Sequence, residues 1–435
     1  MIIKLGNVTV PKNNITAAPE VSREIDAALL TLPIDTLSLT VHRFDGFPEI
    51  KKGLPVNISD DDGKNTDVFF VKAARKMGAD SYSLTCHSWL GKLSQMEYGG
   101  KIYLSPAPFG DIVADIMNDS GVPYSIDATL RSKTASGYIA AGSKREALQQ
   151  LLFAVSGMIA SKGENGIAFV APVEKLKRTV TEDEIGAFPK AEYSDSSKSV
   201  TVAIHKYVKA LPRDTDSFVV IGNNTYIVST DTLTLSDIRA SLNGDFIEDY
   251  SEKRIKNATM LTYDNFSEIV ENVAAVLFND DKYVADAIFD PDVNVGEIAE
   301  FPLFDGETFT GRIEEKTSIL GALNKSSISA NKVVASEHLT LTINYANKAG
   351  EIVHRESLFF PVPCKYTFKK AIVKREDNNY ISAYIPPVDI TGETTSDAET
   401  NVSVKLCAQL NKSNKTLSIF EASRADQTDD LVTMG

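Results

Sequence analysis

The segment from Gly137 to Val170 constrains the fold most strongly, because both the start and the buried face of a helix are marked in it. Ser143 and Glu146 have the spacing of a capping box, in which the serine hydroxyl and the glutamate carboxylate satisfy two free N–H groups reciprocally. Behind this cap, residues at helical spacing form one apolar face, made of Leu148, Leu151, Leu152 and Val155. A strand is expected at Gly166–Pro172. The segment therefore predicts a helix packed on a sheet, and it contains no catalytic motif.

Length and composition indicate a soluble protein of several domains. A chain of 435 residues predicts two to four domains. No apolar run approaches the roughly 20 residues that a membrane-spanning helix needs. The N-terminal sequence lacks the charged, apolar and small-residue zones of a signal peptide. We therefore expect the chain to be made in the cytoplasm and not to leave it by that route.

Cysteines and net charge exclude several functional classes. Three scattered cysteines are too few for a disulfide framework or a zinc site, and buried free thiols are expected at Cys86, Cys364 and Cys407. The net charge of −14 argues against a surface that binds nucleic acid. It is compatible with a channel wall along which DNA slides without binding, since like charges repel.

The N-terminal region reads as short strands. Apolar residues alternate along 37–41, and strands are expected at 54–58, 68–72 and 81–87, the first two joined by the acidic turn Ser59–Gly63. Such spacing is typical of a small barrel or sandwich. A short helix is expected at Ser88–Met96, before the glycine pair at residues 99 and 100.

Helices are predicted in the next region of the sequence, and strands are predicted after it. A helix is expected at Phe109–Asn118, ahead of the capped helix, and Lys190–Ser199 reads as a loop or domain boundary. From Val200 the alternation resumes, with a hairpin at Phe218–Val228 and one further helix at Ser267–Leu277.

The fold class expected from this order is α+β and predominantly β. We predict a first barrel at residues 1–105, an α/β connector domain at 106–195, a second barrel with one helix at 196–335, and a C-terminal β-rich domain at 336–435. The two small barrel-like domains would thus flank an inserted helix-containing domain.

None of the candidate chemical groups forms a recognisable site. The Asp60–Asp67 cluster lacks the terminal Glu and the flanking helices of a calcium loop, so a solvated turn is expected. The five histidines have no metal-ligand spacing. Cys86 and His87, like Glu314 and Glu315, are strand neighbours that point to opposite faces. We therefore predict no catalytic, metal-binding or cofactor-binding residue, and no enzyme activity.

The segments taken in order resemble the baseplate hub family of phage tails and related contractile particles. The resemblance begins at Leu32–Leu37 and continues through Gly53–Ile58 and Leu90–Leu93. It then includes Gly99–Tyr103, Asp111–Met117, Gly137–Ile139, Arg145–Gln150 and Val295–Ile313. It covers roughly residues 20–325, and its collinear order is more specific than any single motif.

The resemblance implies a structural role in a virion or tail-like particle assembled in a bacterial host. Hubs of this family are homotrimers whose two barrels per subunit form a pseudo-sixfold ring, joining a hexameric tail tube to a threefold central spike or tip. The partners implied are the tube, the spike and neighbouring baseplate proteins, with DNA passing through the ring. Two alternatives stay open: a tail-associated cell-wall hydrolase and a host-carbohydrate-binding tail protein. The sequence does not distinguish a contractile from a flexible tail, nor a phage from a headless bacteriocin (tailocin).

Overall fold

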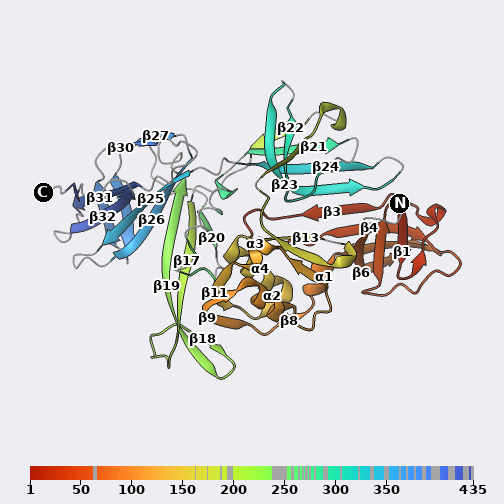
Figure 1. Ribbon diagram of the computed structural model, residues 1–435, viewed down its shortest axis with the longest axis horizontal. Coiled ribbons are helices and arrows are strands. Elements are labelled where there is room, and N and C mark those ends of the chain that lie inside the picture. The colour runs from red at the N-terminus through yellow and green to blue at the C-terminus, as the bar shows by residue number, and fades with distance from the viewer. Residues whose placement is uncertain are drawn as a thin grey trace.

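A computed structural model gives the arrangement of the chain (Figure 1). Beyond residue 337 it describes strand segments only. Before that point it describes residues 1–61, 66–161, 163–173, 175–186, 189–193, 199–237, 252–255, 259–262, 265–266, 269, 273, 276–278, 281–287, 292–303, 306–321 and 324–333.

The N-terminal region forms seven antiparallel strands in the order β3-β4-β7-β6-β5-β1-β2. The strands are β1 (Ile2–Leu5), β2 (Val8–Thr9), β3 (Glu20–Glu24), β4 (Thr36–His42), β5 (Pro55–Ser59), β6 (Asp67–Lys76) and β7 (Ser81–His87), with a short 3₁₀ helix η1 (Lys12–Asn14). In β4 the expected alternation is present, since Leu37, Leu39 and Val41 are buried in the core of this region while Ser38 is exposed. We call these strands the first half-barrel.

The same sheet continues into strands from much later in the chain. These are β15 (Leu176–Thr179), β16 (Lys190–Tyr193), β21 (Asp281–Ala287), β22 (Ile298–Pro302), β23 (Thr308–Ile319) and β24 (Lys325–Lys332). Their core includes Tyr283, whose ring stacks 4.6 Å from Phe301 and 5.5 Å from Phe309. We call this group the second half-barrel. Because β23 pairs with β3, the two half-barrels share one 13-stranded sheet.

Four helices and several short strands, which lie between β7 and β15 in the sequence, pack together. The helices are α1 (Trp89–Leu93), α2 (Phe109–Met117), α3 (Ala128–Arg131) and α4 (Lys144–Val155). The strands are β8 (Glu97–Tyr98), β9 (Lys101–Pro108), β10 (Tyr124–Ile126), β11 (Thr134–Ile139), β12 (Gly142–Ser143), β13 (Met158–Ser161) and β14 (Ile167–Val170), with 3₁₀ helix η2 (Gly163–Asn165); η3 (Glu182–Glu184) follows β15. The apolar face of α4 is fully buried, with Leu148 and Leu151 packed in the same core as Phe109 and Phe169.

A long β-hairpin projects from the molecule at the bottom of Figure 1. It consists of β17 (Ser199–Lys209), β18 (Phe218–Ile221) and β19 (Asn224–Asp237), and β17 also pairs with β20 (Glu252–Ile255). We call residues 206–228 the arm tip. At its base β19 pairs with the C-terminal strands, which lie on the left of Figure 1. These are β25 (His338–Ala346), β26 (Ile352–Pro361), β27 (Cys364–Phe368), β28 (Ala371–Glu376), β29 (Asn379–Tyr384), β30 (Val388–Gly392), β31 (Val402–Gln409), β32 (Leu417–Arg424) and β33 (Leu431–Val432).

The predicted fold class is confirmed: the protein is α+β and mostly β, and the capped helix and the first hairpin are present. One local prediction is wrong, because part of the expected loop at Lys190–Ser199 is strand β16, which pairs with β21. The described residues of the expected helix at Ser267–Leu277 are helical, and the others lie outside the described residues. The domain boundaries stay a prediction. Strand pairing crosses all three of them, since β8 joins β12, β16 joins β21, and β19 joins β26.

Candidate assembly interface

The joint between the half-barrels is a strand ladder between β3 and β23. Here Val21 lies opposite Ser318, and the Thr317 hydroxyl is 3.2 Å from that of Ser22, although those two residues are 295 positions apart in sequence. Beyond the ladder, the Ile25 amide donates to the carbonyl of Glu314 at 2.8 Å. Because relative movement of the half-barrels would break these bonds, the ladder holds them as one rigid unit.

Two carboxyl groups at this joint are held in an unfavourable environment. Burial, with Asp26 and Glu24 nearby, raises the pKa of Glu314 to about 7, against the lowering effects of Lys282 and of a hydrogen bond from the Ala27 amide.

On the first half-barrel, burial raises the pKa of Asp35 to about 6, and the nearby Asp67 acts in the same direction. Arg23, which forms an ion pair with Asp67, and the Glu24 amide oppose this rise. Deprotonation of these two acids therefore lowers the free energy of unfolding of the chain.

Helix α4 is tied to its surroundings by polar contacts at both ends. The Ser143 amide donates to Glu146 Oε2 at 2.8 Å and the Glu146 amide donates to Ser143 Oγ at 3.2 Å, which completes the capping box. The buried Lys144 ammonium donates to the carbonyls of Ile116 and Asn118, where α2 ends and its dipole favours a cation.

Other side chains of α4 reach the segments on either side of it. Arg145 and Gln149 donate to backbone carbonyls at Leu32 and Leu29, in the connection between β3 and β4. At the far end, Asn265 donates to the carbonyl of Ala154, beside the base of the hairpin. The helix thus packs as a brace between these segments.

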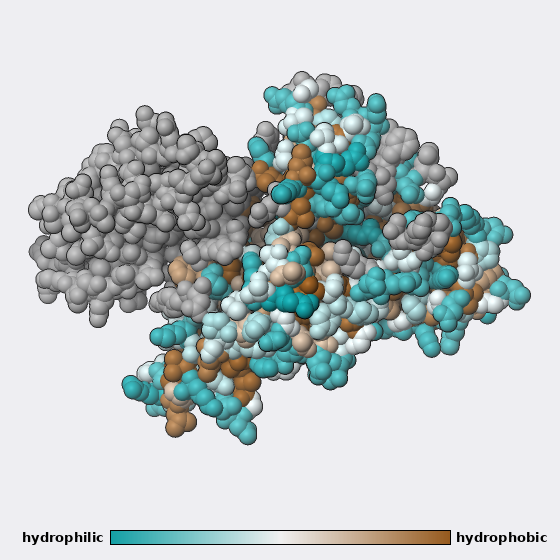
Figure 2. All heavy atoms as spheres, in the orientation of Figure 1, coloured by the Kyte–Doolittle hydropathy of each residue, from teal (hydrophilic) through white to brown (hydrophobic). Residues whose placement is uncertain are grey.

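The arm tip carries the two most exposed large apolar side chains of the described residues, Leu211 and Val220, together with two further exposed ones. Leu211 is 89% exposed, Val220 58%, Phe218 51% and Val208 47%. Figure 2 shows hydrophobic atoms gathered on this projection at the lower left, among hydrophilic ones. Exposed apolar groups of this kind mark contact surfaces for other proteins.

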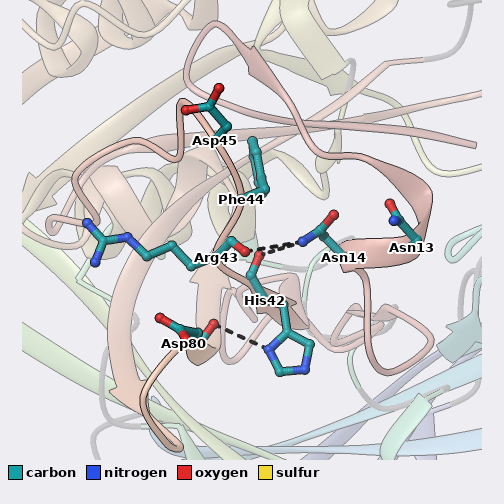
Figure 3. Close-up of a pocket in the computed structure, with 7 residues that line it drawn as sticks. All are labelled: Asn13, Asn14, His42, Arg43, Phe44, Asp45 and Asp80. Carbon is teal, nitrogen blue, oxygen red and sulfur yellow. Dashed lines mark hydrogen bonds between the residues drawn. The ribbon is translucent and has the colours of Figure 1, made fainter.

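One hollow of about 590 Å³ lies at the end of the first half-barrel (Figure 3), lined by Asn13, Asn14, His42, Arg43, Phe44, Asp45 and Asp80. Its turns are linked by hydrogen bonds from Asn14 Nδ2 to the carbonyls of His42 and Arg43, and His42 Nδ1 lies 3.3 Å from the carbonyl of Asp80. In Figure 3 the side chains of Arg43 and Asn13 point to opposite sides. The polar groups therefore do not converge on a ligand position.

The neighbours Cys86 and His87 face apart, as expected, whereas the strand alternation expected for Glu314 and Glu315 is interrupted by a register shift in β23 between Ile313 and Glu315. Cys86 is buried in the core of the first half-barrel, where burial raises its thiol pKa to about 12. The His87 ring packs against Gly91 of α1, and burial together with Lys72 and Lys52 lowers its pKa.

Glu315 is exposed whereas Glu314 is partly buried. The four residues Asp62–Asn65 of the acidic cluster and the side chains of His338, His354, Cys364 and Cys407 lie outside the described residues. The prediction that no residue is catalytic stays a prediction.

Gly100 allows the chain to turn between β8 and β9. It adopts a φ of +79°, and a Cβ there would lie 2.8 Å from the Ala141 amide nitrogen. This is the backbone role expected from sequence.

Within the ranges that the structure describes, no group of three or more His, Cys, Asp or Glu residues is placed to hold a metal ion. A search of the same residues for a helix long and apolar enough to span a membrane finds none.

Comparison with known proteins finds likeness in structure but not in sequence. No protein-family model and no curated protein sequence matches the chain. The crystal structure of the 43 kDa tail protein of prophage MuSo2 from Shewanella oneidensis is similar, with a TM-score of 0.50 at 12% identity, covering 76% of this chain and 97% of that one. The tail protein from Neisseria meningitidis MC58 is similar with a TM-score of 0.50 at 11% identity, covering 76% of this chain and 95% of that one. The larger part of this chain therefore has the fold of phage tail proteins.

Proposed function

We propose that the chain is a structural baseplate hub of a phage tail or a tail-like particle. Three copies form a ring that joins the hexameric tail tube to the threefold central spike or tip. The observation that carries this proposal is the match in fold, which takes in nearly the whole length of two tail proteins.

Two features of the chain support a structural role. The shared sheet and the brace made by α4 give a rigid body, which a connector between two symmetric assemblies needs. The net charge of −14 suits a ring whose inner wall repels DNA as it passes. A ring of identical copies also gives each contact surface a matching partner.

The test is the mass of the full chain in solution, alone and mixed with the adjoining tube and spike proteins. A trimer, or a complex containing three copies, is expected. The proposal fails if the chain stays monomeric in every mixture. A second test is electron microscopy of particles from a strain that lacks the gene. Tails without a completed baseplate are expected.

The wall-hydrolase alternative is tested on the same purified protein. In-gel clearing of peptidoglycan is expected to be absent, and lysis by the purified chain would replace the structural proposal. The carbohydrate-binding alternative predicts that the chain binds host cells, and it is rejected if the free chain does not bind cells that the particle infects.

A further inference from the structure

The arm tip is a three-stranded sheet with its apolar residues in register. In the tip β17 and β18 lie on either side of β19, and all pairs are antiparallel. Val208 lies opposite Ile227, which lies opposite Phe218. Directly opposite residues share a face of the sheet, so these three side chains form a row across three strands. Val220, two residues beyond Phe218, lies on the same face.

The face that carries this apolar row continues along β17 towards the base of the hairpin, where it is buried in a hydrophobic core. Nearer the base, the same side of β17 carries Val200, Val202 and Ile204, which are at most 2% exposed and pack with Phe153 and the helical Ile269. Towards the tip this cover ends, although the apolar pattern of the strand does not.

The opposite face of the tip is better covered. Tyr226 is only 8% exposed, and the Tyr207 hydroxyl donates to the carbonyl of Thr259 at 2.7 Å. A sheet with one covered face normally turns polar side chains to the solvent. The exposed row on the arm tip is therefore the side that is left for a partner.

The charge of the arm tip differs from that of the rest of the chain. Residues 206–228 contain three basic residues, Lys206, Lys209 and Arg213, and two acidic ones, Asp214 and Asp216, which gives +1. Since the whole chain carries −14, the remaining residues carry −15. A second copy of this chain thus offers the arm tip a surface of opposite charge, and such complementarity favours association.

We infer that the arm tip is the contact through which one copy of this chain docks on the acidic body of another. The apolar row of Val208, Phe218 and Val220 supplies the buried area, and Lys206, on the same face of β17, supplies the orientation. The outer edge of β18, which pairs only with β19 in the described part of the chain, lies at the margin of this contact. The inference rests on the proposed function in that it identifies how the copies of the ring associate.

The first test uses the full chain with Phe218→Ser and Val220→Ser together. We expect the dissociation constant of the oligomer, measured by sedimentation, to rise about 10-fold or more, since buried apolar anchors dominate such contacts. Met77→Ser is the matched control, because Met77 is 57% exposed and lies elsewhere, on the loop between β6 and β7. It is expected to leave the dissociation constant unchanged. Thermal unfolding of the variants verifies that both still fold.

The second test identifies the partner of the arm. A photoreactive amino acid at Leu211, which is 89% exposed, is expected to cross-link one copy of the chain to another in the purified oligomer and in assembled particles. Cross-links only to a different tail protein would overturn the inference, and so would a variant oligomer as stable as the wild type. A monomeric wild-type chain would overturn it as well.

These outcomes separate the inference from the proposed function. If the arm variants associate normally and still enter complete baseplates, the arm inference fails and the hub proposal stands. If the wild-type chain is absent from tails, the hub proposal fails whatever the arm does.

Discussion

Replacing Glu314 by Gln should stabilise the protein, and increasingly so as the pH rises. The group has its pKa raised from 4.5 to about 7 in the folded chain. Between these values the folded protein keeps a proton that the unfolded chain has already released. Its free energy of unfolding therefore falls as the pH rises through this window and stays low above it.

The size of the effect follows from the shift. Each pKa unit corresponds to about 1.4 kcal/mol, so ionisation of Glu314 lowers the free energy of unfolding by up to ~3 kcal/mol above pH 7. Glutamine is neutral at every pH, and its Oε1 still accepts from the Ala27 amide that Glu314 binds. The variant should match the wild type near pH 4 and exceed its free energy of unfolding by ~1–3 kcal/mol at pH 8.

Urea unfolding between pH 4 and 8.5, followed by the fluorescence of Trp89, the single tryptophan, measures this difference. Glu315→Gln is the matched control, because it removes an exposed carboxyl one residue away. It should change the free energy of unfolding by less than ~0.5 kcal/mol. Parallel pH profiles for Glu314→Gln and the wild type would refute the burial argument.

Three further substitutions test the packing of the helical region, each by calorimetric unfolding. Ser143→Ala removes the capping box and should lower the free energy of unfolding by about 1 kcal/mol; an unchanged melting temperature would contradict the observed cap. Leu148→Ala opens a cavity at a residue that is 0% exposed and should cost about 2–5 kcal/mol. Gly137→Ala should cost more than ~1 kcal/mol, since φ is +122° and the added Cβ would lie 2.8 Å from Met260 Cα. Gly99→Ala, where nothing lies within 4 Å of the new Cβ, is its control and should be nearly neutral.

The sequence predicted the helical region well because its signals are local. The capping pair Ser143 and Glu146 is three residues apart, and the apolar face of α4 repeats within one element. The hairpins were predicted for the same reason: each strand is joined to its partner by a short turn. The match in fold to two phage tail proteins agrees with the resemblance, which is built on the order of such local segments.

The long-range joints were not predictable in this way. Ser22 and Thr317 meet across 295 residues, and nothing in either segment identifies the other. The polar sequence of Lys190–Tyr193 favours a loop, and the segment forms a strand because the edge of β21 is there to pair with. Both cases depend on tertiary contacts, which override local propensity.

The arm tip allows residues that stabilise the fold to be distinguished from residues that serve association. Along β17 the alternation is equally apolar at Val202 and at Val208, yet only Val202 is buried in the core. The free chain therefore gains little stability from Val208, Phe218 or Val220, and polar residues there would make it more soluble. Substitutions in the core should act on folding, and substitutions on the tip should act on association at unchanged stability. An exposed apolar row that contributes little to the stability of the monomer is best explained by a contact that the monomer does not contain.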